Sequence, residues 1–255
     1  MKHIQAKKKL GQNFLIDQEA LIVIADAIVI DGKKIIEVGP GYGALTDYII
    51  QRSPLSLDLI ELDSDMIAIL KQKYTELNIH IHHTDVLNFV PQFQEYSVIA
   101  NIPYYITSPI LFHFLYNIPR KPDEMVIMMQ EEVWLKILEW RSKKIHHSFL
   151  SLCIEQACQD IEIIQYVDRT CFDPQPKVDS IVLRFISRKN RNLEKEENLI
   201  NLWKIAFSHP RKTLLSNLKW STYNSKKIQE SLIMMGYHDR VRAEAIKKED
   251  WESLL

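Results

Sequence analysis

The sequence predicts an α/β fold, in which helices cover both faces of a parallel sheet and a small all-helical domain follows. Short apolar runs typical of strands alternate with helix-like segments over residues 17–186, which is the pattern of a parallel sheet. A glycine cluster, Gly39–Gly43, lies where a predicted strand meets a predicted helix. Residues 187–192 form a polar, basic linker, and only helical patterns follow it. We therefore expect one domain over residues 1–190 and a helical domain over residues 191–255.

Each predicted element has a local signal. Asp17 suits the N-cap of a helix that runs to about Ile30, because an aspartate side chain accepts hydrogen bonds from the first helical turn. Asp31 and Gly32 then turn the chain into the first strand. Strands are expected at residues 34–38, 57–61, 79–83, 98–100, 125–129 and 180–186. Further helices are expected at residues 44–52, 64–77, 194–208, 211–218, 225–235 and 242–255.

Composition excludes several classes of protein. Apolar residues make up 46% of the chain and charged residues 25%, which is ordinary for a soluble globular protein. No apolar stretch reaches the roughly 18 residues of a membrane-spanning helix, and the basic residues 1–9 lack the apolar segment of a secretory signal. The cysteines are few and lack metal-site spacing, so we expect reduced thiols in a cytoplasmic protein without a metal. They are Cys153, Cys158 and Cys171.

The near-neutral net charge of −1 hides an asymmetry along the chain. Residues 182–255 carry 15 Lys and Arg against 9 Asp and Glu, whereas residues 1–181 carry 17 against 24. A basic helical domain beside an acidic body suits contacts with phosphate groups.

The loop after the first strand indicates a cofactor site. Gly39, Gly41 and Ala44 fit the dinucleotide-binding fingerprint, and Glu61, 22 residues after Gly39, suits a ribose hydroxyl. The same elements suit S-adenosylmethionine, which has a ribose but no phosphate. Glu37, expected at the mouth of the loop, favours the second ligand because a carboxylate repels pyrophosphate but tolerates a cation.

A third acidic residue supports this interpretation. Asp85 follows the third strand, where its side chain can accept a hydrogen bond from the adenine amine of the cofactor. Acidic residues at three successive strand ends favour S-adenosylmethionine, and a nicotinamide cofactor is the second possibility.

The tetrapeptide Asn101–Tyr104 follows the fourth strand, at the sheet edge where open α/β folds bind ligands. An adenine amine is a weak nucleophile because its lone pair is delocalised into the ring. The side-chain oxygen of Asn101 and the carbonyl of Ile102 can orient that amine for attack on a methyl group, and Pro103 restricts the local backbone. Tyr104 offers a face for an extruded base, since stacking contributes about 1–3 kcal/mol.

These motifs together closely resemble the bacterial small-subunit rRNA adenine dimethyltransferases, the kasugamycin-sensitivity (KsgA) family. The resemblance runs from Lys8 to about Lys219. It rests on residues 9–15, 37–46, 60–63, 85, 101–104, 172–180 and 206–214.

The resemblance implies a Rossmann-like class I methyltransferase domain and a helical RNA-binding domain. It also implies transfer of two methyl groups to each of two adjacent adenosines near the 3′ end of 16S rRNA, within the 30S subunit or its precursor, by a monomeric enzyme. Phe172 would form a second aromatic wall opposite Tyr104, whereas without the family it would be assigned to the core. The cofactor contacts implied are Asn13, Leu15, Gly39, Glu61, Asp85 and Asn101.

Three segments depart from the usual family pattern at positions where RNA contacts are plausible: Glu131, residues 147–151 and Pro210. The cofactor and target motifs are unchanged. The candidate phosphate contacts are Lys7, Lys8, Lys9, Arg141, Lys143, Lys144, Arg211 and Lys212.

Three other functions compete with this one. A related class dimethylates a single adenosine of 23S rRNA and shares the Asn101–Tyr104 motif, but Gly11, the glycine loop and residues 211–214 favour the small-subunit class. A non-catalytic RNA- or DNA-binding factor on the same fold would have no need of Asn101 and Glu61. A nicotinamide oxidoreductase leaves Asn101–Tyr104 unexplained.

Overall fold

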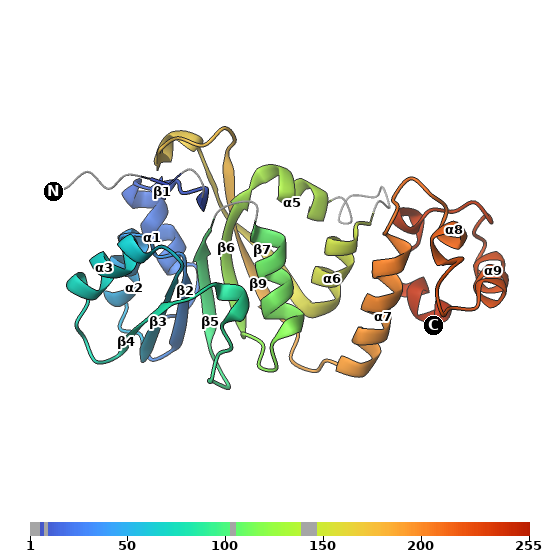
Figure 1. The fold of residues 1–255 in the computed structure, drawn as a ribbon, viewed down its shortest axis with the longest axis horizontal. Helices are drawn as coiled ribbons and strands as arrows, with labels where there is room; N and C mark the ends of the chain where they lie inside the picture. The colour runs from blue at the N-terminus through green and yellow to red at the C-terminus, as the bar shows by residue number, and fades with distance from the viewer. Residues whose placement is uncertain (1–5, 8–9, 103–105, 139–146) are drawn as a thin grey trace. The chain divides into compact units, whose positions relative to one another are not determined.

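The computed structural model describes residues 6–7, 10–102, 106–138 and 147–255 (Figure 1). It divides into two compact units, one of residues 1–132 and 158–189 and the other of residues 133–157 and 190–255. The second unit therefore includes the segment 133–157, which the division of the sequence at residue 190 assigns to the first domain. The reason is packing, because the helix at the end of this segment contacts the first helix after residue 190.

The first unit is built on a seven-stranded sheet. The sheet order is β4-β3-β2-β5-β6-β9-β7, in which the five strands from β4 to β6 are parallel and β9 runs antiparallel to both of its neighbours. The strands are β2 (Lys34–Val38), β3 (Ser56–Glu61), β4 (Ile79–His83), β5 (Ser97–Asn101), β6 (Glu124–Gln130), β7 (Cys158–Val167) and β9 (Ser180–Ser187).

The expectation of a parallel sheet holds for the five strands from β4 to β6, whereas the pairings of β9 with β6 and β7 are antiparallel. The strand β9 is almost continuously buried, so its apolar pattern carries no information about its direction. The connection between β7 and β9 contains a 3₁₀ turn and β8 but no α-helix, whereas the crossover between parallel neighbours is usually made through an α-helix. The strand β7, which forms the sheet edge, was not predicted either, since exposed and buried residues do not alternate regularly along it.

The order of the strands reverses between β2 and β5. From β2 the chain continues outward through β3 to β4, and then returns to place β5 on the other side of β2. Connections that leave two neighbouring parallel strands in opposite directions open a crevice beyond their carboxyl ends, where open α/β sheets bind ligands. The glycine loop follows β2 and Asn101 ends β5, so both lie at this crevice.

Three helices cover one face of the sheet. They are α1 (Gln18–Asp26), α2 (Ala44–Ile50) and α3 (Ser64–Lys73), which lie together beside β2, β3 and β4 in Figure 1. Their apolar side chains pack against alternate residues of the strands, as the side-chain alternation of a strand requires. This core includes Ala20, Ile24, Ile35, Leu45, Ile49, Leu57, Leu59, Leu70, Ile99 and Val126.

Helix ends differ from the predicted ones where tertiary contacts intervene. Asp17 caps α1 by accepting from the backbone N–H of Ala20 at 2.8 Å, as predicted. The helix ends at Asp26, because Ile28 and Ile30 enter the core from an extended segment. Helix α3 ends before Tyr74, whose hydroxyl bonds the carbonyl of Gly43 at 2.9 Å.

The opposite face of the sheet is also buried. The helix α4 (Thr107–Phe112) and the helical turn η4 (His113–Asn117) contribute Ile110, Leu111 and Phe114, none of which has any exposed surface. A separate two-stranded ladder pairs β1 (Phe14–Leu15) with β8 (Phe172–Asp173). Strands of two residues have no periodic pattern, so the sequence analysis missed both.

The second unit is helical. The aromatic rings of Trp203 and Trp251, 6.4 Å apart and nearly perpendicular, form the centre of its core. No strand occurs in residues 190–255, all of which are described, but the helix predicted at 242–255 forms two 3₁₀ segments instead. The helices are α5 (Glu131–Leu138), which begins in the first unit, α6 (Phe149–Ala157), α7 (Leu193–Ala206), α8 (Leu214–Leu218), α9 (Ser225–Met234), η6 (Ala243–Ala245) and η7 (Lys248–Leu254).

Within the described part of the chain, no helix combines the length and apolarity needed to cross a membrane.

A buried ion pair stabilises the start of α7. The guanidinium of Arg191 binds both carboxylate oxygens of Glu196, and both side chains are almost fully buried. Asn192, between them in the sequence, caps the helix by accepting from the N–H of Lys195. Removing Glu196 would take away the carboxylate that faces the buried charge of Arg191.

We predict that Glu196→Gln lowers the free energy of unfolding by about 3–5 kcal/mol, the usual effect of breaking a buried pair. Urea unfolding followed by tryptophan fluorescence measures it. Glu197→Gln is the matched control, since Glu197 is exposed on the same helix. Equal stability of the two variants would contradict a stabilising role for the pair.

Candidate active site

A cleft of about 1080 Å³, measured out to its open mouth, lies at the carboxyl ends of the parallel strands. The N-terminal segment forms another wall. Among the described residues that line the cleft there are acidic side chains but no Lys or Arg. The lining includes residues 10–15, Glu37–Tyr42, Ile60–Leu62, Thr84–Val86, Asn101, Ile102, Ile106, Ile110 and Phe172.

The glycine loop brings the backbone into close contact with its surroundings. Gly39 has φ of +70°, and a Cβ on it would lie 3.1 Å from the carbonyl oxygen of Asn101. Gly41 has φ of +57°, and a Cβ there would lie 3.0 Å from the ring of Phe14. A side chain at either position would meet steric conflict as well as backbone strain. Glycine thus allows the end of β2 to approach both β5 and the N-terminal segment.

Glu61 places a buried carboxylate on the floor of the cleft. Its Oε1 accepts the backbone N–H groups of Leu62 and Asp63, each at 2.8 Å, and its Oε2 accepts that of Gly41 at 3.1 Å. Burial raises the pKa of Glu61, and these three N–H donors oppose that rise. A carboxylate oriented in this way can accept hydrogen bonds from ligand hydroxyl groups.

Glu37 differs from its expected position. It lines the cleft, but with 1% of its surface exposed it lies inside the sheet beneath the loop, where it accepts from the hydroxyl of Thr46 at 2.7 Å. Burial raises its pKa to about 8. The side chain is therefore mostly protonated at neutral pH, and the expectation of a charged group at the mouth of the loop is wrong.

The remaining predicted cofactor contacts gather around the same cleft. Asp85 lies just after β4 and caps a short helical turn by accepting from the N–H of Leu87 at 2.9 Å. Asn13 and Leu15 lie on the N-terminal segment, on the opposite wall. The predicted cofactor contacts thus come from five separate segments of the sequence and line one space.

The predicted target motif begins at this cleft. Asn101 and Ile102 line it, and Asn101 lies beside Met128 of β6. Phe172 lines the cleft while its side chain is 4% exposed and also belongs to the apolar core, so the two interpretations of this residue are compatible. Pro103 and Tyr104 lie outside the described residues.

Three of the candidate phosphate contacts lie among the described residues. Arg211 and Lys212 are exposed, just before α8 in the helical unit. Lys7 is paired with Asp63 and Asp65. The others, Lys8, Lys9, Arg141, Lys143 and Lys144, lie outside the described residues.

The positions that depart from the usual family pattern lie among the described residues, and His147 and Glu131 make backbone hydrogen bonds there. The backbone N–H of His147 donates to the carbonyl of Glu244 at 2.9 Å within the helical unit, and burial lowers the pKa of its imidazole. The backbone N–H of Glu131 donates to the carbonyl of Asp179 at 3.2 Å. Pro210 is exposed.

Sequence reasoning did not single out Leu10, Gln12 or Tyr42 as lining residues, nor Asp63 as a side chain that holds the N-terminal segment. For Asp63 a signal existed, since it lies two residues after Glu61 at the end of a strand. Its partners, five or more residues apart in the N-terminal segment, had no pattern that pointed to it.

Comparison with solved structures agrees with this fold. A structure of a dimethyladenosine transferase from Plasmodium falciparum superposes with a TM-score of 0.78 at 25% identity, covering 95% of this chain and 96% of that one. The 23S rRNA methyltransferase ErmE has the same fold, with a TM-score of 0.69 at 23% identity over 95% and 98% of the two chains. The fold and cleft define a Rossmann-like methyltransferase with a helical region, as predicted.

The sequence comparisons show the family. The model described as Ribosomal RNA adenine dimethylase matches residues 3–255. The protein named Ribosomal RNA small subunit methyltransferase A from Mycoplasmopsis pulmonis is 39% identical over 99% of this chain and 98% of its own length. The protein of that name from Geobacillus thermodenitrificans is 36% identical over 97% and 89%. The chain belongs to the ribosomal RNA adenine dimethylase family, which confirms the resemblance.

Glu37 makes a pH-dependent contribution to stability that can be measured. Between its ordinary pKa of 4.5 and about 8, the folded protein holds a proton on Glu37 that the unfolded chain has lost. This group therefore makes stability fall as the pH rises through that interval.

We predict that Glu37→Gln reduces this loss. Relative to wild type, the variant should gain at least about 1 kcal/mol between pH 5 and pH 8.5, since one pKa unit corresponds to about 1.4 kcal/mol. Urea unfolding without ligand at the two pH values provides the measurement, with the exposed Glu76→Gln as control. Parallel pH profiles for wild type and Glu37→Gln would show that Glu37 is ionised in the folded state.

Proposed function

We propose that this protein is an S-adenosylmethionine-dependent 16S rRNA adenine N6,N6-dimethyltransferase. It transfers methyl groups to two adjacent adenosines near the 3′ end of 16S rRNA, in the 30S subunit or its precursor, and contributes to small-subunit biogenesis in the cytoplasm. The observation that carries the proposal is that Asn101 and Ile102 line the same cleft as Gly39 and Glu61. A target amine held at the end of β5 would thus lie beside the bound cofactor.

The cleft fits S-adenosylmethionine. When bound, this cofactor supplies an electrophilic methyl group on a sulfonium. The carboxylate of Glu61, supported by three backbone N–H groups, is suited to the ribose hydroxyls, and Asp85 to the adenine amine. Gly39, Asn13, Leu15 and Asn101 would complete the contacts. A nicotinamide oxidoreductase would leave Asn101 and Ile102 at the cleft unexplained, so that alternative is not proposed.

The chemistry at the target follows from acceptors at the end of β5. The side-chain oxygen of Asn101 and the carbonyl of Ile102 accept from the adenine amine and favour the geometry in which its lone pair faces the methyl group. Phe172 supplies one aromatic wall, and we assign Tyr104, whose position is not described, to the other. The ammonium formed by transfer is acidic and loses a proton to water, so no residue of the chain has to act as a general base.

RNA binding is assigned to the helical domain and to basic segments. Arg211 and Lys212 are exposed in a short turn of the helical unit, which suits contacts with phosphates. Lys8, Lys9, Arg141, Lys143 and Lys144 remain candidates, and the functional division at residue 190 remains a proposal. We propose that a monomer acts on the particle.

We predict that Asn101→Ala lowers methyl transfer at saturating cofactor by at least about 100-fold, the usual effect of removing a group that orients or stabilises the reacting atoms. Its affinity for the 30S particle should stay within about threefold, since base contacts near the target are few compared with phosphate contacts. Tritiated methyl incorporation and filter binding measure the two effects. Asn198→Ala, an exposed asparagine of the helical unit, is the control. Transfer by Asn101→Ala at near wild-type rate would overturn the role of Asn101.

The rRNA substrate is tested by offering two alternatives. We expect methylation of immature 30S particles, with dimethyladenosine at two neighbouring positions of 16S rRNA by mass spectrometry, and no methylation of protein-free 23S rRNA. Activity only on 23S rRNA would identify the macrolide-resistance class instead. Binding of 30S particles without methylation of either RNA would identify a non-catalytic assembly factor.

A further inference from the structure

The N-terminal segment crosses the cofactor cleft and is held at both of its ends. We call Lys7 together with residues 10–15 the strap. Residues 10–15 line the cleft. The ring of Phe14 packs on that of Tyr42 in the glycine loop, with the two ring centroids 5.1 Å apart. A ligand on the floor of the cleft would therefore lie under the strap.

The end of the strap after Phe14 is held by backbone pairing. The strand β1 pairs antiparallel with β8, with Leu15 opposite Phe172. The N–H of Ile16 also donates to the carbonyl of Cys171 at 2.9 Å. These are main-chain bonds beside a buried aromatic residue, so this end is a stable anchor.

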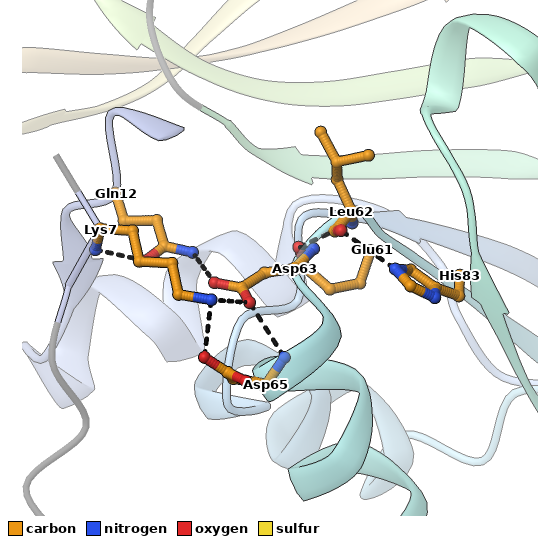
Figure 2. A network of polar contacts seen from close by, with 7 residues as sticks. All are labelled: Lys7, Gln12, Glu61, Leu62, Asp63, Asp65 and His83. Carbon is orange, nitrogen blue, oxygen red and sulfur yellow. Dashed lines mark hydrogen bonds and ion pairs between the residues drawn. The ribbon is translucent and has the colours of Figure 1, made fainter. Parts of the chain in front are cut away.

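At the other end, the described bonds to the rest of the unit come from the side chains of Lys7 and Gln12, and both of them meet Asp63 (Figure 2). The ammonium of Lys7 lies 2.5 Å from Oδ1 of Asp63 and 2.6 Å from Oδ2 of Asp65. The amide of Gln12 donates to Oδ2 of Asp63 at 2.9 Å. The side-chain oxygen of Gln12 accepts the backbone N–H of Lys7 at 2.8 Å, which joins the two strap residues to each other.

Burial and hydrogen bonds hold Asp63 itself in place. Its side chain is fully buried, it caps α3 by accepting from the N–H of Asp65 at 3.0 Å, and its own N–H donates to Glu61. The neighbouring carbonyl of Leu62 bonds the ring of His83 at 3.2 Å (Figure 2). The residue that holds the strap is thus adjacent, through one N–H group, to the carboxylate assigned to the cofactor ribose.

The two ion pairs of Lys7 differ in strength. Asp65 has 68% of its side chain exposed, and exposed pairs contribute little. Asp63 is buried, so loss of Lys7 would leave its charge with only Gln12 and one backbone N–H as partners. Because the Lys7 side chain is itself 40% exposed, dissolved salt still weakens its attraction to Asp63.

We propose that Asp63 is a positioning residue which, through Lys7 and Gln12, latches the strap over the cofactor cleft, and that opening of this latch limits release of the cofactor. The proposal rests on the cofactor assigned above. It makes cofactor release sensitive to salt through a pair of residues that need not touch the ligand.

The test measures release of S-adenosylhomocysteine from the full-length protein without RNA. This product has no net charge, so salt acts on the protein and not on the charge of the ligand. We expect Lys7→Met to release it roughly tenfold faster than wild type at low salt, as loss of a partner to a buried charge should allow. Raising the salt should speed release from wild type and leave Lys7→Met nearly unchanged.

Matched variants separate a latch from a general loss of structure. Lys195, whose side chain is exposed to a similar extent as that of Lys7, pairs with the exposed Glu252 in the helical unit, and Lys195→Met should release the ligand at the wild-type rate. Lys7→Arg should restore slow release. Asp63→Asn, which keeps the helix cap, should behave like Lys7→Met, and if it does not fold then the lysine variants carry the test.

The possible results distinguish the latch from the proposed function. Release from Lys7→Met at the wild-type rate and with the wild-type salt dependence would overturn the latch alone. Failure of wild type to bind S-adenosylhomocysteine at all would overturn the proposed function, and the latch with it.

Discussion

The close approach of the glycine loop to the end of β5 is the constraint on which the rest of the site depends. Gly39 lies so near the carbonyl of Asn101 that even a methyl side chain would meet it at 3.1 Å. This contact is possible because β2 and β5 are parallel neighbours whose carboxyl ends lie side by side, and the reversal of strand order between them opens the crevice for a ligand. The cofactor loop and the target motif, more than 60 residues apart in the sequence, thereby share one cleft.

This arrangement buries carboxyl groups, which disfavours their charged form. Each group has a different set of hydrogen-bond donors that opposes this effect. Glu61 receives three backbone N–H donors, which favour its charged form in a buried place. Glu37 receives only the hydroxyl of Thr46, and its pKa is raised to about 8. Asp63 receives an ammonium, an amide and a backbone N–H, and these hydrogen bonds overcome the effect of burial and lower its pKa. The pKa shifts of these three carboxyl groups therefore depend on their donors as well as on burial.

Through the strap, the charge of Asp63 can affect the exchange of ligand in the cleft. One of its ends is tied by main-chain bonds to β8 and the other by side-chain bonds to Asp63. Main-chain pairing beside the core is hard to open, whereas an ion pair with a partly exposed lysine is easier to break. The weaker end lies beside Glu61, so a change there acts directly where we place the cofactor.

The sequence by itself determined the elements with strong local patterns and the residues of local motifs. The predicted strands at 34–38 and 79–83 coincide with β2 and β4, and Asp17 caps α1 as predicted. Asn13, Gly39, Glu61, Asp85, Asn101 and Phe172 were named from motifs, and all of them line one cleft. Such signals survive because backbone turns, caps and strand ends are set by neighbours in the chain.

Only the tertiary structure decided features that depend on partners distant in the sequence. The antiparallel direction of β9, the β1–β8 ladder and the burial of Glu37 follow from packing between segments. The bonds of Asp63 to Lys7 and Gln12 span more than 50 residues. A sequence pattern records whether a residue is apolar or charged, but the direction of a buried strand, the charge of a buried acid and the partner of an aspartate are set by what the folded chain places around them.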